Sequence, residues 1–178
     1  MGWLWRDISA VDVTVHAGSS ITADEQGYTG GATGQAGNGP GGGCGSTLYD
    51  SAGGNHGGLG SGLGTCSPGP SYGAALMPAD LGSGGGGTTT TAGGSGYGPR
   101  VGGNGGGAIR LIVPETLTIN GAIFANGSNG INYAGGGSGG SIHVNVGILT
   151  GSGAFTANGG SRLFGQDVIY PGAEPNAP

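Results

Sequence analysis

Two cysteines, Cys44 and Cys66, are the residues of this 178-residue chain whose spacing most directly suggests chemistry. Free thiols and half of a metal site are alternatives, but no CxxC pair accompanies them, and His56 is the only nearby imidazole. A disulfide between them would close a loop of about 23 residues and contribute roughly 3 kcal/mol of stability. The sequence therefore predicts a Cys44–Cys66 disulfide, and with it an oxidising, extracellular environment.

Other catalytic and cofactor-binding patterns are missing from the sequence. Nothing pairs the nine acidic residues as a glycosidase would require. Matches to GxGxxG are frequent, but none follows a strand and opens a helix, and a chain without lysine has no Walker loop. We expect no enzymatic activity, no cofactor and no metal site.

Two segments could carry sugar. Asn126-Gly-Ser128 is an N-glycosylation sequon in an expected turn. The threonine run at residues 88–91 suits O-linked glycan, although a plain β-strand and a flat hydroxyl face for ice are alternatives. The candidate glycosylation residues are Asn126, Thr88, Thr89, Thr90 and Thr91.

The charge balance excludes some partners. The net charge is −5, and the only basic residues are four scattered arginines, so neither nucleic acid nor an anionic membrane is expected to bind. No apolar run approaches the roughly 18 residues of a membrane span. The first residues are too few and too soon charged for a secretory signal, so we expect a mature fragment, a piece of a larger protein or another export route.

Glycine dominates the composition, with 50 residues. Collagen is excluded because no strict three-residue glycine period runs through the chain. Disorder is disfavoured because 34% of the residues are hydrophobic and form short runs. A mixture of short strands and long glycine-rich stretches fits better.

Three related units supply the strands. Residues 15–21, 117–123 and 149–155 share an aliphatic residue, a turn-forming middle and an apolar residue six positions on. Alternating runs at 108–113 and 141–146 precede the second and third units, which repeat at 32 to 33 residues. The pattern predicts an all-β fold of stacked short strands, solenoid-like in form.

Residues 27–107 separate the first unit from the second and are rich in glycine. Such segments can form polyglycine-II helices, which have three residues per turn and hydrogen-bond to one another through their backbones. We expect scattered apolar residues, among them Leu59, Leu76 and Met77, to anchor this stretch to the β core. The expected organisation is a single domain (1–178) with a first β unit (8–26), a glycine-rich insertion (27–107), two β repeat units (108–165) and a Pro-rich tail (166–178).

The motifs Gly-Gly-Gly-Ala-Ile-Arg-Leu (105–111), Leu-Thr-Ile-Asn-Gly-Ala-Ile-Phe-Ala-Asn-Gly (117–127) and Pro-Ala-Asp-Leu-Gly-Ser-Gly-Gly (78–85) carry a resemblance. They resemble the glycine-rich repeat regions of large secreted or surface proteins of bacteria, over residues 8 to 165. The resemblance implies an extracellular stalk-like body and no particular reaction. In composition alone, the glycine-rich stretch is similar to the polyglycine-II bundles of phage tail-fibre adhesins and of a springtail antifreeze protein.

Both ends depart from the repeat pattern and carry apolar segments. These could pair with a neighbouring copy and yield a head-to-tail polymer, or complete the β core of their own chain. The sequence thus favours a self-assembling extracellular structural protein; a receptor- or carbohydrate-binding adhesin and an ice-binding protein are the alternatives. The candidate inter-subunit residues are Trp3, Leu4, Trp5, Val168, Ile169 and Tyr170.

Overall fold

The computed structural model describes residues 5–47, 51–62, 66–89 and 100–163. Within these ranges the chain forms two parallel sheets and no helix, which confirms the expectation of a β-rich fold. The strands are β1 (Trp5–Ser9), β2 (Val13–Val15), β3 (Ser20–Thr22), β4 (Ala108–Ile119), β5 (Ala122–Phe124), β6 (Ser141–Thr150) and β7 (Ala154–Thr156).

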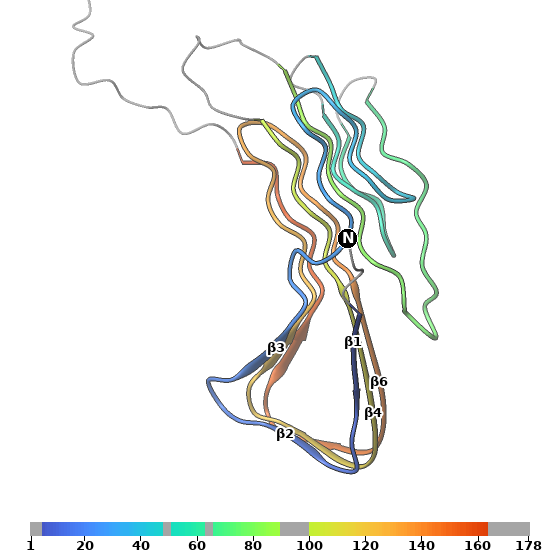
Figure 1. Ribbon diagram of the computed structural model, residues 1–178, viewed down its shortest axis with the longest axis vertical. Helices are drawn as coiled ribbons and strands as arrows, with labels where there is room; N and C mark the ends of the chain where they lie inside the picture. Colours follow the sequence, from blue (N-terminus) through green and yellow to red (C-terminus); the bar gives the residue numbers. More distant parts are fainter. Residues whose placement is uncertain (1–4, 48–50, 63–65, 90–99, 164–178) are drawn as a thin grey trace, which may run out of the picture.

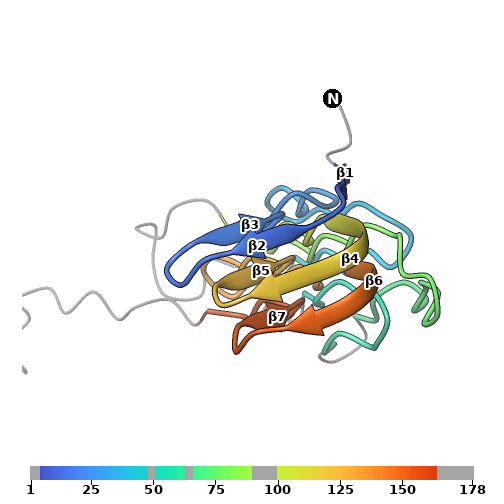
Figure 2. The ribbon, with the colours of Figure 1, turned by 90° about the horizontal axis from the view of Figure 1, so that it is seen from below.

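Three stretches of the chain lie one above another and follow similar paths (Figure 2). The first holds β1, β2 and β3, the second β4 and β5, and the third β6 and β7. In one sheet β4 is central, with β1 and β2 along one edge and β6 along the other; in the second sheet β5 lies between β3 and β7. All these pairings are parallel, so the order of the layers is their order in the sequence.

The core lies between the two sheets and depends mainly on β4. Ile109, Leu111 and Val113 are at most 1% exposed, whereas Arg110 between them faces solvent. This period of two is the one expected of a strand with one buried face. The residues that cluster in this core are Val15, Ala23, Ile109, Leu111, Val113, Leu117, Ile119 and Ile123.

The register of the first layer differs from the sequence alignment. The repeat pattern matched Val15 to Leu117, but Val13 pairs with Leu117 and Val15 pairs with Ile119. Ile21 still pairs with Ile123, because the turn between β2 and β3 is longer than the turn between β4 and β5. A longer turn between strands absorbs such a difference without disturbing the core.

The sequence left open whether the amino-terminal apolar segment pairs with a neighbouring copy or with its own chain, and β1 pairs with its own chain. Trp5 begins β1 and pairs with Ala108 of the same chain, so its backbone contributes to an intramolecular sheet. The amino-terminal segment therefore adds to the β core of its own chain from residue 5 onward. Trp3, Leu4, Val168, Ile169 and Tyr170 lie outside the described residues.

Glycine-rich segments run side by side from one apex of the triangular outline that the strands enclose (Figure 1). Residues 82–88 lie at the centre of this bundle, and all of residues 81–88 are buried. Their backbone exchanges hydrogen bonds with six surrounding stretches, at residues 28–31, 35–38, 43–46, 52, 100–106 and 135–138. The bundle is therefore not confined to residues 27–107, because the glycines that precede β6 belong to it as well.

These hydrogen bonds recur every third residue. Gly82 and Gly85 donate to Gly106 and Gly103, and Thr88 continues the series by donating to Arg100. The same spacing joins residues 135 and 138 to residues 86 and 83, and residues 28 and 31 to residues 82 and 85. Since an extended helix with three residues per turn directs every third amide the same way, each segment can bond to neighbours on several sides.

The close approach of the segments explains the glycine content. A Cβ added at Gly85 would lie 2.1 Å from the carbonyl oxygen of Gly135, and one at Gly103 would lie 1.9 Å from that of Ser128. Neither contact is physically allowed, so side chains are excluded inside the bundle. The expected anchoring by Leu59, Leu76 and Met77 is wrong, because these side chains are 80%, 92% and 69% exposed.

Candidate functional site

The third layer ends the stack of described strands, and its outer edge is a candidate site of contact. β6 pairs with β4 on one side, and β7 pairs with β5. Within the described part of the chain, no strand pairs with the opposite edge of either. A free strand edge presents unpaired N–H and C=O groups that a further strand can bind.

Apolar side chains that are buried in the second layer are exposed in the third. Leu117 is fully buried, but its register partner Leu149 is 54% exposed; Ile123 is fully buried, but Phe155 is 38% exposed. Partners in a parallel, in-register pair lie on the same face of the sheet. Leu149 and Phe155 are thus core-type residues whose cover is missing at the end of the stack.

Carboxylate and amide side chains tie each layer to the next. The Oδ1 atom of Asp24 accepts a hydrogen bond of 2.6 Å from the N–H of Asn126, and Oδ1 of Asn126 accepts one of 2.8 Å from the N–H of Asn158. Oδ1 of Asn129 likewise accepts from the N–H of Ser161 at 2.7 Å. The layers are therefore joined by a ladder of side-chain acceptors as well as by strand pairing. The backbone N–H of Asn158 is the donor at the third layer.

A groove of about 960 Å³ opens beside the third layer. One wall comes from residues 53–61 without Asn55, together with residues 73–75 and 78; the floor comes from residues 135–142 and the other wall from residues 155–162 without Asn158. His56 lines it, and its Nδ1 lies 2.9 Å from the carbonyl oxygen of Gly139. The groove thus lies between glycine-rich segments and next to the free edge of β7.

Tyr72 supports the wall that carries His56. The two rings lie 4.9 Å apart at 55°. The Tyr72 hydroxyl donates to the carbonyl oxygen of Leu81 and lies 2.8 Å from Oγ of Ser83. Burial, as the largest cause, raises the pKa of Tyr72 to about 12, so the hydroxyl keeps its proton and its donor role at physiological pH.

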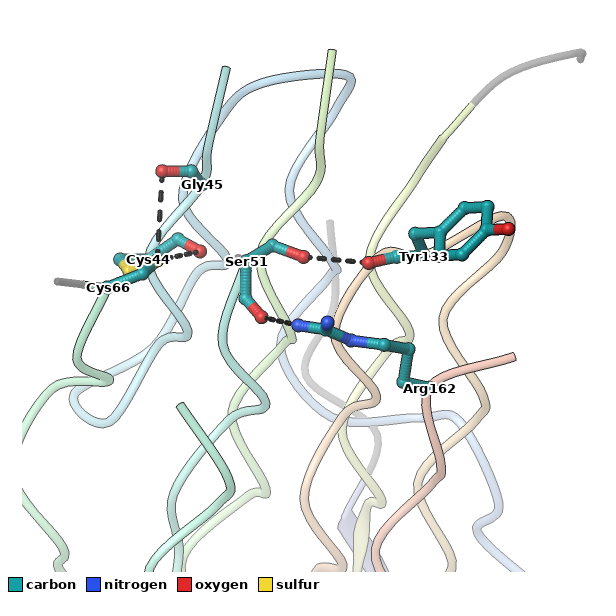
Figure 3. Close-up of a disulfide and its surroundings, with 6 residues drawn as sticks. All are labelled: Cys44, Gly45, Ser51, Cys66, Tyr133 and Arg162. Atoms are coloured by element: carbon teal, nitrogen blue, oxygen red, sulfur yellow. Dashed lines mark hydrogen bonds between the residues drawn. A yellow bond between two sulfur atoms is a disulfide. The ribbon is translucent and has the colours of Figure 1, made fainter. Parts of the chain in front are cut away.

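The predicted disulfide is confirmed. Cys44 and Cys66 are bonded, with their Cα atoms 5.8 Å apart. The bond joins the segment around residue 44, which hydrogen-bonds to residues 52, 84 and 87, to the stretch that begins at residue 66. Nearby, Ser51 contacts both Tyr133 and Arg162, which connects this part of the bundle to the third layer (Figure 3).

The candidate glycosylation residues occupy different environments. Thr88 is fully buried, so it offers no site for a sugar, whereas Thr89 is exposed. Oδ1 of Asn126 is engaged in the ladder between layers, and its Nδ2 is the atom that an N-linked sugar would occupy. Thr90 and Thr91 lie outside the described residues, and glycosylation stays a prediction.

Within the ranges that the structure describes, no group of three or more His, Cys, Asp or Glu side chains could hold a metal ion. The same ranges hold no helix long and apolar enough to cross a membrane. An exposed ion pair joins β1 to β4: Nη2 of Arg110 donates to Oδ2 of Asp7 at 2.6 Å. The guanidinium lowers the pKa of the Asp7 carboxyl by this hydrogen bond.

Sequence reasoning named neither Leu149 and Phe155 as contact residues nor the groove as a site. The repeat pattern did mark both apolar positions, and their place in the last recognisable repeat was the available signal. The groove had no comparable signal, because glycine segments carry no side chains that identify their neighbours. No protein-family model, curated protein or solved structure matches this chain.

Proposed function

We propose that this chain is an extracellular structural protein that assembles head to tail. Its body combines a short β-solenoid, formed by the three layers, with a polyglycine-II bundle. The free edge of β6 and β7 receives the first layer of the next copy, so that the parallel stack continues across the joint. A contact between two different surfaces of the same chain does not close on itself and produces a filament.

The proposal rests above all on the contrast between the second and third layers. Leu149 and Phe155 hold the positions of Leu117 and Ile123, yet only the latter pair is buried. Covering Leu149 and Phe155 with another layer would remove apolar surface from water, and each would then gain the burial that its equivalent already has. Among the described strands, the first layer offers a matching free edge along β1, β2 and β3.

The disulfide supports the extracellular assignment, because such bonds persist in oxidising compartments. A bundle held by backbone hydrogen bonds also suits a protein exposed to proteases, since cleavage requires local opening of the chain. Head-to-tail self-association makes the protein its own main partner.

Substitution of Leu149 tests the assembly. Leu149→Lys would place a charge at the proposed joint, and because Leu149 is already 54% exposed, the fold itself should tolerate the change. The matched control is Leu76→Lys, since Leu76 is also an exposed leucine but lies outside the strands. Electron microscopy and sedimentation velocity would follow both variants and the unmodified protein over a wide concentration range.

The unmodified protein and Leu76→Lys should form filaments or concentration-dependent oligomers, whereas Leu149→Lys should remain monomeric. Thermal unfolding curves should show that all three proteins are equally folded before heating. Monodisperse unmodified protein at every concentration would refute the proposal, as would filaments of Leu149→Lys as long as those of the control.

A further inference from the structure

The backbone amides along the groove point to a specific occupant. In the segment 134–140, five of the seven N–H groups have partners: those of residues 134, 135, 137, 138 and 140 donate to carbonyl oxygens of residues 131, 86, 128, 83 and 125. The N–H groups of Gly136 and Gly139 have no partner among the described residues. They are three residues apart, as are the amides that serve each neighbouring segment, and both residues line the groove.

In two segments that neighbour 134–140, every backbone N–H group has a partner. Every N–H from residue 82 to residue 88 donates to a carbonyl or a side-chain oxygen, as does every one from residue 102 to residue 107. A buried amide without a partner is costly, and both Gly136 and Gly139 are buried. In contrast to the amides of these two segments, those of Gly136 and Gly139 have no partner among the described residues, and they occur where one neighbouring segment is missing.

The second layer shows what would fill the gap. Gly103 and Gly106 hold the positions equivalent to Gly136 and Gly139, because Ala108 pairs with Ser141. Their N–H groups donate to the carbonyl oxygens of Gly135 and Ser138, which belong to the glycine segment of the next layer. An analogous segment in the groove would accept from Gly136 and Gly139 with two carbonyls about 9 Å apart along an extended threefold helix.

Three glycines that line the groove have unusually open surroundings for this protein. A Cβ added at Gly58 would meet no atom within 4 Å, and those added at Gly53 and Gly159 would have nearest neighbours at 3.4 and 3.5 Å. Inside the bundle the same atom would lie near 2 Å from backbone, as at Gly85. Contacts within one chain thus do not require glycine at these three positions, but close approach of another backbone would.

We infer that the groove is a binding site for an extended glycine-rich segment of a second copy of this chain, held by the N–H groups of Gly136 and Gly139. The inference rests on the proposed self-assembly and identifies a second contact of its joint, separate from the apolar edge at Leu149 and Phe155. The occupant needs small residues against both walls and a carbonyl at every third position. The stretch 134–140 of this chain has the required composition, since it contains only Ala, Gly and Ser; because it is buried in its own chain, it serves here as the model for a peptide probe and not as the inserted segment.

Amide exchange measured by NMR on the full chain, labelled with ¹⁵N-glycine, would test the site directly. In the dilute protein, Gly136 and Gly139 should exchange faster than Gly135, Gly137 and Gly140, because only the latter three donate hydrogen bonds. The probe is a synthetic peptide with the sequence of residues 134–142. At saturation it should slow the exchange of Gly136 and Gly139 by about tenfold or more and leave the other three unchanged.

Three controls define the result. Gly159→Leu should fold, because its Cβ would make only an ordinary contact, but its side chain should fill the groove and abolish the effect of the peptide. Ala36→Leu places a leucine side chain at an exposed position outside the groove and should leave the effect intact. A peptide in which alanine replaces every glycine should not bind.

Absence of protection at millimolar peptide would overturn the inference, and so would equal protection in Gly159→Leu. Binding of sugars rather than peptide in the groove would also overturn it. If the peptide binds but the protein never assembles, the proposed filament fails while the site stands. If filaments form and Gly136 and Gly139 still exchange rapidly within them, the filament stands and the site fails.

Discussion

At the scale of single residues, Tyr72 links the glycine bundle to the pH dependence of stability. Its hydroxyl bonds to Leu81 and Ser83, and burial raises its pKa to about 12, above the ordinary value of 10.0. Between these values the unfolded chain loses the phenolic proton more readily than the folded one. The stability contributed by Tyr72 is therefore full below pH 10 and falls as the pH rises through 12.

Tyr72→Phe should lower the free energy of unfolding at pH 7 by about 1 kcal/mol, because Leu81 and Ser83 would lose a hydrogen-bond partner. It should also remove part of the decline in stability above pH 10. Urea unfolding at pH 7 and pH 11 would measure both effects. An equal loss of stability with pH in the variant and the unmodified protein would contradict this assignment.

The disulfide also leads to a prediction about the free energy of unfolding. Replacing both Cys44 and Cys66 by alanine should lower the free energy of unfolding by about 3 kcal/mol, since the unfolded chain would regain the freedom of the closed loop. Chemical denaturation of the double variant, compared with the reduced unmodified protein, would check it. The two should agree closely, and a double variant as stable as the oxidised protein would count against a stabilising role.

At the scale of elements, the bundle and the strands obey different rules of substitution. Gly85→Ala would bring a Cβ to 2.1 Å from backbone, whereas Gly58→Ala would meet nothing within 4 Å. We expect Gly85→Ala to cost at least about 3 kcal/mol, because no flexible side chain can move aside. Gly58→Ala should change stability by less than about 0.5 kcal/mol.

Thermal or chemical unfolding of the two variants would separate these cases. The pair is well matched, since both changes add one methyl group and neither glycine has a left-handed φ. An equally small loss of stability in both variants would mean that the backbone around residue 85 leaves room for a methyl group.

The sequence revealed the strands better than it revealed their neighbours. Alternation in β4 marked Ile109, Leu111 and Val113 as one buried face, and the structure bears this out. β1 carries little sequence signal of a core strand, because Arg6 and Asp7 interrupt its apolar pattern; within residues 6–9, Ile8 is the side chain that packs against the core. The expected register of β2 is two residues off, since its short run fits either alignment and the pattern does not show the length of the turn that follows.

The bundle was predictable in kind but not in arrangement. The high glycine content predicted extended helices. The sequence of a run such as residues 84–87, however, does not indicate which six stretches surround it. Specific neighbours arise from hydrogen bonds between identical backbone groups, and these leave no trace in residue type. The groove was hidden for the same reason, because it is defined by the amides of Gly136 and Gly139, which lack partners among the described residues.

At the scale of the whole molecule, the balance between apolar core and backbone hydrogen bonding should appear in the heat capacity of unfolding. Among the residues that the structure describes, the clustered core consists of eight, and the bundle buries mainly peptide groups. Exposing apolar surface raises the heat capacity, whereas exposing peptide groups lowers it. An ordinary globular protein of this length would show an increase of about 2.1 to 2.7 kcal/mol/K, and we expect this protein to show well under about 2 kcal/mol/K.

Differential scanning calorimetry at several pH values would supply the measurement, with the disulfide intact and the protein dilute enough to exclude assembly. A small heat-capacity change gives a flat stability curve, so the protein should lose little stability between about 5 and 35 °C compared with an ordinary domain of similar melting temperature. A value in the ordinary range would show that apolar burial, rather than the hydrogen-bonded glycine bundle, dominates folding. In that case the apolar core, and not the bundle, would hold the body of the protein together.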